Sequence, residues 1–316
     1  MRNGLLIVMF VCILIPAELP AQDPDNPQSR IPGLIADLAS DYLAHNAGTA
    51  IGELRKIGPP AGAALESALA SQDYQQRQIA AHLLRKMGGY KPTAALLSVT
   101  VEGLRDDTLP REDWPSGAST YTAVRNAAEG TLYLLKHVEQ ARPYLERGLR
   151  GSDEQQRTLS AFVLAIADGD AAASSLYEPH FRAALHSASA QQRFLGAYIM
   201  GVLNIKTDLQ TCTAILLDHT KDNRYPMDAA VSIQALSRLG KGLLPHLTAA
   251  QAWADPQQKK AISRVRSQLR DRPLGKRVLK SSLHCVWFPA KWRIGVSANH
   301  GGAIRARSRK SVKYPG

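Results

Sequence analysis

Residues 71–88, SQDYQQRQIAAHLLRKMG, contain the start, the body and the end of one short helix. Asp73 can accept a hydrogen bond from a backbone N–H of the first turn, and Gln76 can reach back to the N–H of the cap itself. The cation Arg77 follows, and Gly88 stands where a helix is expected to stop. This stretch therefore predicts a complete helix that begins with a capping box.

The same cap recurs along the chain. The acceptor and its glutamine are found again at three places: Asp153 with Gln156, Ser189 with Gln192, and Asp255 with Gln258. The residue after the glutamine is a cation each time: Arg77, Arg157, Arg193 and Lys259. Four copies of one pattern predict a repeating unit. We expect the repeated Gln and Arg to close helix N-termini and to tie turns between adjacent units, not to act in catalysis.

The spacing of the caps defines the unit. Two weaker caps, Thr120 and Asp222, complete a series whose members are separated by 47, 33, 36, 33 and 33 residues. A proline lies ten residues before three of these caps, at Pro143, Pro179 and Pro245. Each unit is therefore predicted to be a first helix that carries a proline, a turn, and a second helix that begins at the cap.

A two-helix unit of this size cannot bury its apolar face alone, so neighbouring units must stack. The sequence therefore predicts an all-α fold, a right-handed α-α superhelix of six to seven helical pairs. We place this solenoid at residues 33–272, after a linker at residues 22–32.

The repeats resemble HEAT repeats, which form armadillo-like solenoids, and in particular the short HEAT-like repeats of bacterial proteins. Residues 57–88, IGPPAGAALESALASQDYQQRQIAAHLLRKMG, carry the resemblance: a proline opens the first helix, an acidic turn follows, and Arg77 lies in the second helix. The period is shorter than in the longer eukaryotic type, and the fourth and fifth full units lose part of the pattern. The resemblance covers roughly residues 33–270 and implies ladders of polar residues and an extended binding surface, and a few relatives are associated with lyase or chaperone-like activity.

The spacing of 47 residues marks an insertion, DTLPREDWPSGAST, at residues 107–120. Insertions in a solenoid map to loops on one face, often the binding face. Glu112, Asp113 and Trp114 combine two carboxylates with an aromatic ring, and we expect them to form a binding site for a protein partner. The alternative is a loop tip whose tryptophan packs on the stack.

The first residues predict export. Residues 1–21, MRNGLLIVMFVCILIPAELPA, contain one early cation, an apolar run and a small residue before a polar stretch, which is typical of a signal peptide cleaved after Ala21. The apolar run is shorter than an ordinary membrane span, although a retained anchor is the alternative. We expect a periplasmic or extracellular protein. After cleavage two cysteines remain, Cys212 and Cys285, and the sequence does not show whether they form a disulfide. The helical context of Cys212 favours its interpretation as a small buried apolar residue.

The basic C-terminal tail, residues 273–316, contains ten Lys or Arg and no Asp or Glu, in a chain of net charge +12. Trp287 and Trp292 alternate there with Lys291 and Arg293. Such a mixture can bind an anionic envelope polymer or an anionic membrane surface, and no specific recognition of nucleic acid is expected. A solvated disordered tail and a wrong reading frame are the other interpretations.

No catalytic constellation is recognisable in the sequence. The histidines form no metal-binding pair with a carboxylate partner, and no phosphate loop, nucleophile elbow or Cys–His pair occurs. We interpret ADGD, with Asp168 and Asp170, as a turn and not as a calcium loop. The predicted function is a non-catalytic scaffold for protein–protein interaction, without cofactor or metal. The alternatives are an envelope polyanion binder that acts through the tail, and a lyase-like enzyme by family analogy.

Overall fold

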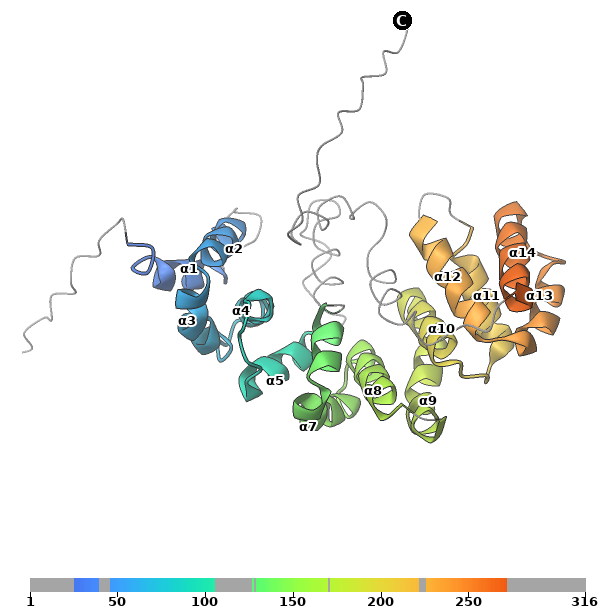
Figure 1. The fold of residues 1–316 in the computed structure, drawn as a ribbon, viewed down its shortest axis with the longest axis horizontal. Helices are drawn as coiled ribbons and strands as arrows, with labels where there is room; N and C mark the ends of the chain where they lie inside the picture. Colours follow the sequence, from blue (N-terminus) through green and yellow to red (C-terminus); the bar gives the residue numbers. More distant parts are fainter. Residues whose placement is uncertain are drawn as a thin grey trace, which may run out of the picture. The chain divides into compact units, whose positions relative to one another are not determined.

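The structure is a computed structural model of the 316-residue chain. It describes the following residues: 26–39, 46–105, 127, 129–169, 171–221 and 226–271. Within these ranges every regular element is a helix and no strand occurs (Figure 1). None of the described helices is both long enough and apolar enough to cross a membrane. The all-α prediction is confirmed.

The chain forms two compact units, Met1–Met87 and Gly88–Gly316. The described residues of the first unit form four α-helices and one 3-10 turn: α1 (Ile31–Asp37), α2 (Asn46–Ile57), η2 (Pro59–Ala61), α3 (Gly62–Ala68) and α4 (Tyr74–Lys86). Helix α1 packs on α2 and α3, and α4 packs on α2 and α3. Leu38, Leu54, Leu65 and Leu84 are fully buried between them. The first helix thus begins two residues before the predicted start of the solenoid.

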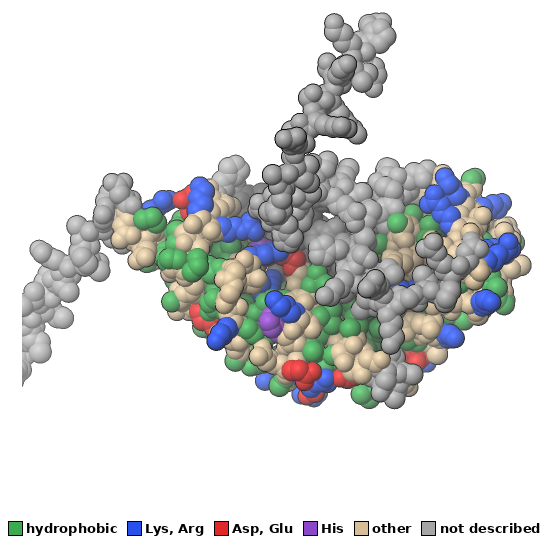
Figure 2. Space-filling view, in the orientation of Figure 1, with side chains coloured by type: hydrophobic (Ala, Val, Ile, Leu, Met, Phe, Trp, Pro, Cys, Tyr) green, Lys and Arg blue, Asp and Glu red, His purple; other side chains and the backbone are tan. Residues whose placement is uncertain are grey.

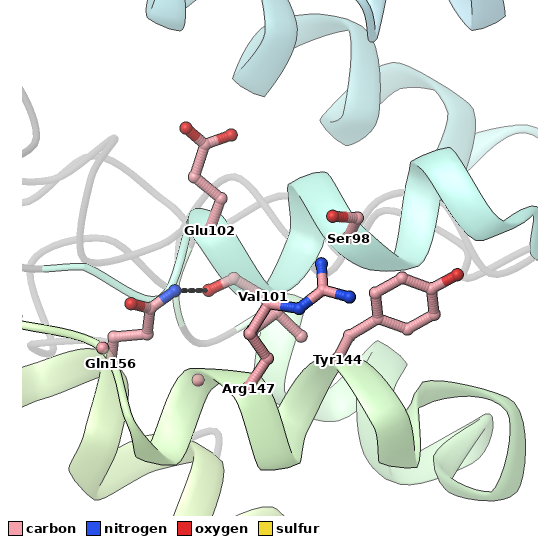
Figure 3. Close-up of a pocket in the computed structure, with 8 residues that line it drawn as sticks. Ser98, Val101, Glu102, Tyr144, Arg147 and Gln156 are labelled. Carbon is pink, nitrogen blue, oxygen red and sulfur yellow. Dashed lines mark hydrogen bonds between the residues drawn. The ribbon is translucent and has the colours of Figure 1, made fainter.

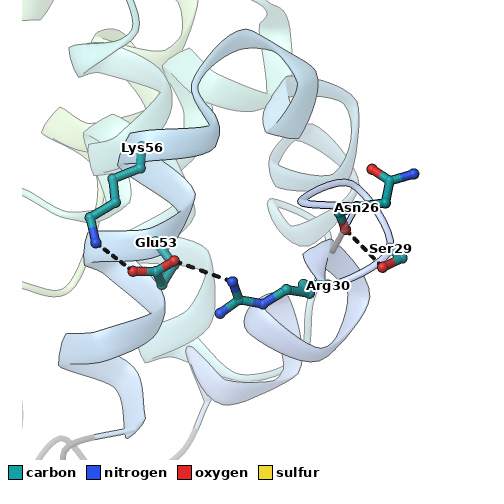
Figure 4. Close-up of polar contacts among 5 residues, drawn as sticks. All are labelled: Asn26, Ser29, Arg30, Glu53 and Lys56. Atoms are coloured by element: carbon teal, nitrogen blue, oxygen red, sulfur yellow. Dashed lines mark hydrogen bonds and ion pairs between the residues drawn. The ribbon is translucent and has the colours of Figure 1, made fainter. Parts of the chain in front are cut away.

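Polar contacts tie the beginning of α1 to α2 (Figure 4). Glu53 of α2 lies between two cations, with Arg30 Nη1 at 3.5 Å and Lys56 Nζ at 2.7 Å. The hydrogen bond from Lys56 is the largest of the effects that lower the pKa of Glu53. The Ser29 hydroxyl donates a hydrogen bond to the Asn26 carbonyl at 2.8 Å, which closes the turn before α1.

The second unit continues the helical pairs. Its described α-helices are α5 (Ala94–Glu102), α7 (Val138–Leu149), α8 (Glu154–Asp168), α9 (Ala171–Leu185), α10 (Ala190–Leu203), α11 (Leu209–Asp218), α12 (Pro226–Arg238), α13 (Leu244–Ala250) and α14 (Pro256–Asp271), with a 3-10 turn, η3 (Lys241–Leu243), before α13. Consecutive helices from α7 to α12 pack against one another. In addition α8, α10, α12 and α14 contact one another in succession, and α11 contacts α13. This packing in rows is that of an α-solenoid.

The three prolines that precede caps by ten residues lie in first helices of pairs, as predicted. Pro143 is inside α7, Pro179 is inside α9, and Pro245 lies in the first turn of α13. The largest fully buried side chains lie in both kinds of helix: Phe162 in α8 and Tyr198 in α10 are in second helices, and Phe181 is in the first helix α9.

Two glycines of α10 allow its neighbours to approach closely. A Cβ atom added to Gly196 would lie 2.5 Å from the backbone nitrogen of Leu185, at the end of α9. A Cβ atom added to Gly201 would lie 2.8 Å from the Cβ and the carbonyl oxygen of Ala235 in α12. The backbones of α9, α10 and α12 are therefore closer together than any larger residue at these two positions would permit.

Candidate functional site

The repeated caps stand at helix N-termini. In each, a side-chain oxygen accepts a hydrogen bond from the backbone N–H of the glutamine three residues later. The donor–acceptor distances are 2.6 Å for Asp73 and Gln76, 2.7 Å for Asp153 and Gln156, 3.4 Å for Ser189 and Gln192, and 2.8 Å for Asp255 and Gln258. These bonds begin α4, α8, α10 and α14 and satisfy one of the N–H groups that a helix start leaves without a partner.

The reciprocal half of the capping box is present at α14, where the Asp255 N–H donates to Gln258 Oε1 at 2.9 Å. At α4 and α10 the N–H of the cap donates instead to a serine hydroxyl two residues earlier, Ser71 or Ser187. The expectation that Gln76 and Gln192 reach back to the cap is therefore wrong. A closer serine oxygen accepts that hydrogen bond.

The glutamine side chains connect different helical pairs. Nε2 donates to a carbonyl in the last turn of the first helix of the preceding pair: Gln76 to Ile35 at 2.7 Å, Gln156 to Val101 at 3.0 Å, and Gln258 to Leu217 at 3.3 Å. These carbonyls are among those that a helix end leaves unsatisfied. The partners are 41, 55 and 41 residues apart. The extra 14 residues equal the length of the insertion at 107–120, so the insertion leaves this contact unchanged.

The preceding glutamine contributes to the same contact between pairs. Gln75 Nε2 donates to the Leu38 carbonyl at 3.1 Å, and the buried Gln155 donates to the Leu104 carbonyl at 3.0 Å. The phrase Gln-Gln therefore links one pair to the end of a helix in the previous pair.

The arginine after the second glutamine donates hydrogen bonds to the turn of its own pair. The prediction that it connects turns of adjacent units is therefore wrong. Its Nη1 atom donates to two consecutive carbonyls, five and six residues earlier: Arg77 to Ser71 and Gln72, Arg157 to Gly151 and Ser152, and Arg193 to Ser187 and Ala188. The distances are between 2.6 and 3.0 Å. Within the described part of the chain, Lys259 makes no such bond and its side chain is exposed. Because the turn folds back beside the helix that it precedes, the guanidinium reaches its own turn first.

The binding residues predicted from the sequence lie outside the described residues. These are Glu112, Asp113 and Trp114 in the insertion, and Trp287, Lys291, Trp292 and Arg293 in the basic tail. Residues 1–21 and Cys285 lie outside them too.

A cleft lies between α5, α7 and the start of α8 (Figure 3). It has a volume of about 300 Å³ and is lined by Ser98, Val101, Glu102, Tyr144, Arg147, Gly148, Gly151 and Gln156. The hydrogen bond from Gln156 to the Val101 carbonyl crosses from α8 to α5 (Figure 3). Hence a residue of the repeat pattern also forms part of the cleft.

Two glycines shape the cleft. A Cβ atom added to Gly148 would lie 2.5 Å from Ser160 Oγ, so this glycine lets the end of α7 approach α8. A Cβ atom added to Gly151 would lie 2.7 Å from Gln156 Oε1. Larger residues at these two positions would collide with Ser160 and with Gln156.

The side chains of the cleft are chemically mixed. Tyr144 and Arg147 lie one turn apart on α7, and the guanidinium carbon of Arg147 is 5.8 Å from the centroid of the Tyr144 ring. Ser98 of α5 lies near the guanidinium, and Glu102 extends away from it (Figure 3). Glu102 ends α5, five residues before the insertion at 107–120. The guanidinium can bind a carboxylate, and the ring can cover an apolar group.

Sequence reasoning missed the side chains of this cleft. The sequence predicted the stretch that contains Tyr144 and Arg147 only to be a first helix carrying a proline. The available signal was an aromatic residue and a cation at a spacing of three, followed by glycines at positions 148 and 151.

An ion pair links α7, α8 and α9. Arg142 Nη2 lies 2.6 Å from Asp168 Oδ1, and the Tyr177 hydroxyl donates to Asp168 Oδ2 at 2.9 Å. The hydrogen bond from Arg142 is the main reason that the pKa of Asp168 is lowered. Asp168 ends α8, and Gly169 follows with a φ of +74°. The segment ADGD therefore contains a helix end, as the turn interpretation requires.

Two of the described histidines and the described cysteine lie in partly or fully buried surroundings. Burial lowers the pKa of His180 and His219, and the His219 ring lies 3.9 Å from that of Phe194. Cys212 is buried, and this burial raises the pKa of its thiol to about 12. In the part of the chain that the structure describes, no three His, Cys, Asp or Glu side chains are grouped so that they could hold a metal ion.

Comparisons with known proteins give little guidance on identity. No family model matches the chain, and no curated protein matches it. Among solved structures it is similar to the X-ray structure of YIBA_ECOLI, a Northeast Structural Genomics Consortium target, with 18% identity over 76% of this chain and 92% of that one. The TM-score is 0.37, so no inference about function rests on this similarity.

Proposed function

We propose that this chain is an exported, non-catalytic HEAT-type scaffold whose cleft between α5, α7 and α8 binds a protein partner. The observation that carries the proposal is the cleft itself, which places an exposed arginine beside a half-buried tyrosine. Tyrosine and arginine are enriched among residues that contribute most to protein–protein binding. Extended binding surfaces are also what stacked helical repeats commonly provide.

The side chains suggest what kind of segment the cleft accepts. Within the described residues, Arg147 donates no hydrogen bond to another side chain, so its guanidinium is available to a ligand. Tyr144 also lines the cleft, to which it contributes an apolar ring and a hydroxyl. We therefore assign to it an extended segment of a partner polypeptide that carries a carboxylate next to an apolar side chain.

The test is site-specific crosslinking in the native cell envelope. The full chain carries p-benzoylphenylalanine in place of Ser98, which lines the cleft, or in place of the exposed Arg150, which does not. A partner crosslinked from position 98 and absent from position 150 is expected. Arg147→Ala should weaken binding of that partner by about 2 kcal/mol, the range of a strong interface residue, while Arg150→Ala leaves it unchanged. Equal crosslinking from both positions would contradict the proposal.

The HEAT assignment and export rest on the sequence patterns given above. The repeated turn supports the former, since one set of contacts recurs at α4, α8 and α10. The N-terminal apolar run supports the latter. Mass spectrometry of the protein recovered from its source should show a chain that begins at Gln22. A chain that still contains residues 1–21 would refute cleavage after Ala21.

A further inference from the structure

Apart from its last residue, Asp271, helix α14 carries only cationic residues among its charged ones. Residues 256–270 contain five Lys or Arg and no Asp or Glu. Four of these side chains are exposed: Lys259, Lys260, Arg264 and Arg270. The fifth, Arg266, is half-buried and donates a hydrogen bond to Thr248 Oγ1 at 2.8 Å. Lys and Arg side chains gather at the end of the second unit that carries α13 and α14 (Figure 2).

The opposite side of α14 is apolar and packed. Ala261, Ile262 and Val265 are buried, and α14 contacts α11 and α12. Lys260 and Arg264 are four residues apart and so project from one side of the helix. None of the ion pairs among the described residues involves the four exposed cations. Their charge is therefore directed to solvent.

The sequence that follows cannot neutralise this charge. Residues 273–316 contribute ten further cations and no carboxylate side chain, so they repel α14. An occupant that complements this side therefore carries negative charge.

An exposed aromatic side chain lies at the same end of the unit. Trp253 precedes α14 in the turn after α13, and 54% of its surface is exposed. Tryptophan favours the headgroup region of a bilayer, where its ring is partly buried and its N–H remains hydrated. Cations near an anionic bilayer are attracted to it without needing a shaped pocket.

We propose that Trp253, Lys259, Lys260, Arg264 and Arg270, here called the α14 surface, dock on an anionic phospholipid membrane. These cations have no ion-pair partner among the described residues, and their combination with an exposed tryptophan favours lipid over a soluble polyanion, which would require the charges alone. This inference is independent of the cleft between α5, α7 and α8, because it rests on different helices. It places the membrane contact on the folded repeats.

The test measures co-sedimentation of the full chain with vesicles of phosphatidylcholine containing 30% phosphatidylglycerol, with pure phosphatidylcholine vesicles for comparison. Each cation near an anionic surface contributes about fivefold in partitioning, so the double variant Lys260→Gln/Arg264→Gln should lower the partition coefficient about 25-fold. The matched control, Lys136→Gln/Lys206→Gln, removes the same charge from exposed positions elsewhere and should change it less than about threefold, because it lacks the local contact.

The Trp253→Ala variant separates lipid from other anions. It should lower partitioning into the anionic vesicles and leave retention on heparin unchanged. Helical circular dichroism and the thermal midpoint of each variant establish that the chain stays folded, as expected for exposed positions.

Three results would overturn the proposal. Equal losses in the α14 double variant and its control would show an effect of net charge alone. Unchanged vesicle binding in the α14 variant would place the contact elsewhere in the chain. Loss of heparin retention without loss of vesicle binding would make a soluble polyanion the ligand.

Discussion

The turn before α8 and the turn before α14 share one sequence pattern but differ in structure. In both, an aspartate accepts a hydrogen bond from the N–H of a glutamine, and that glutamine donates to a carbonyl of an earlier helix. Before α8, Arg157 then bonds the carbonyls of Gly151 and Ser152. Before α14 the same position is Lys259, which points to solvent.

This difference separates two functions of the repeated phrase. The cap depends on one short side chain next to the backbone, so it recurs wherever the acceptor is present. The arginine contact requires a planar group with several donors, which can bond two carbonyls at once, whereas a lysine ammonium is a compact and strongly hydrated charge. At the turn before α14 the two carbonyls therefore lack the bonds that arginine makes elsewhere, and the charge of Lys259 faces solvent.

The largest expected effect tests the close packing of the middle repeats, with an exposed position of the C-terminal pair as the control. Gly196→Ala should lower the free energy of unfolding by about 3 kcal/mol, because the new Cβ meets the backbone of α9. Ser263→Ala, on the exposed side of α14, should change it by less than about 0.5 kcal/mol. Urea denaturation measures both. A Gly196 variant as stable as the parent would mean that the close contact of α9 and α10 is absent.

The next effect tests whether the caps are equivalent. Asp153→Ala and Asp255→Ala should each cost about 1 kcal/mol, since each removes the same bond to a helix N–H. Thermal melts of the two variants, with Asn at each position as a control that keeps an acceptor, provide the measurement. Unchanged midpoints in both would show that the repeated phrase is not a capping device.

A smaller effect distinguishes the two regions by their response to acid. The pKa of Asp168 is lowered in the folded protein, mainly by the hydrogen bond from Arg142. Its stabilising contribution is therefore complete above the ordinary value of 3.8 and is lost as the pH falls through the lower folded pKa. Asp168→Asn should remove about 0.5 kcal/mol at pH 7 and flatten this acid dependence. Lys260 has no carboxylate partner among the described residues, so Lys260→Gln should leave the acid dependence of stability unaltered. The measurement is the free energy of unfolding against pH, and an equal slope in the parent, Asp168→Asn and Lys260→Gln would contradict the role given to Asp168.

The sequence predicted those features that depend on neighbouring residues. Asp73 and Asp153 were identified as caps because a cap and its helix are adjacent in the chain. Pro143 and Pro179 were placed in first helices from their constant distance to the caps.

The features that depend on stacking could not be predicted in this way. The acceptor of Gln156 is 55 residues away, and the path of the turn decides which carbonyls Arg157 reaches. The cleft arises where α5 meets α7, and the spacing of Tyr144 and Arg147 within α7 does not show which helix lies opposite them.

The most direct test of whether the arginine holds the repeated turn is a reciprocal exchange of Arg157 and Lys259. Arg157→Lys should lower the free energy of unfolding by about 1.5 kcal/mol, close to the loss in Arg157→Ala, because the bonds to two carbonyls are lost while the charge is kept. Lys259→Arg should not destabilise the protein. Amide hydrogen exchange at residues 151–156, read together with urea denaturation, reports on the turn itself. Faster exchange in Arg157→Lys is the predicted result, and unchanged exchange and stability in that variant would contradict the claim that the arginine holds the repeated turn.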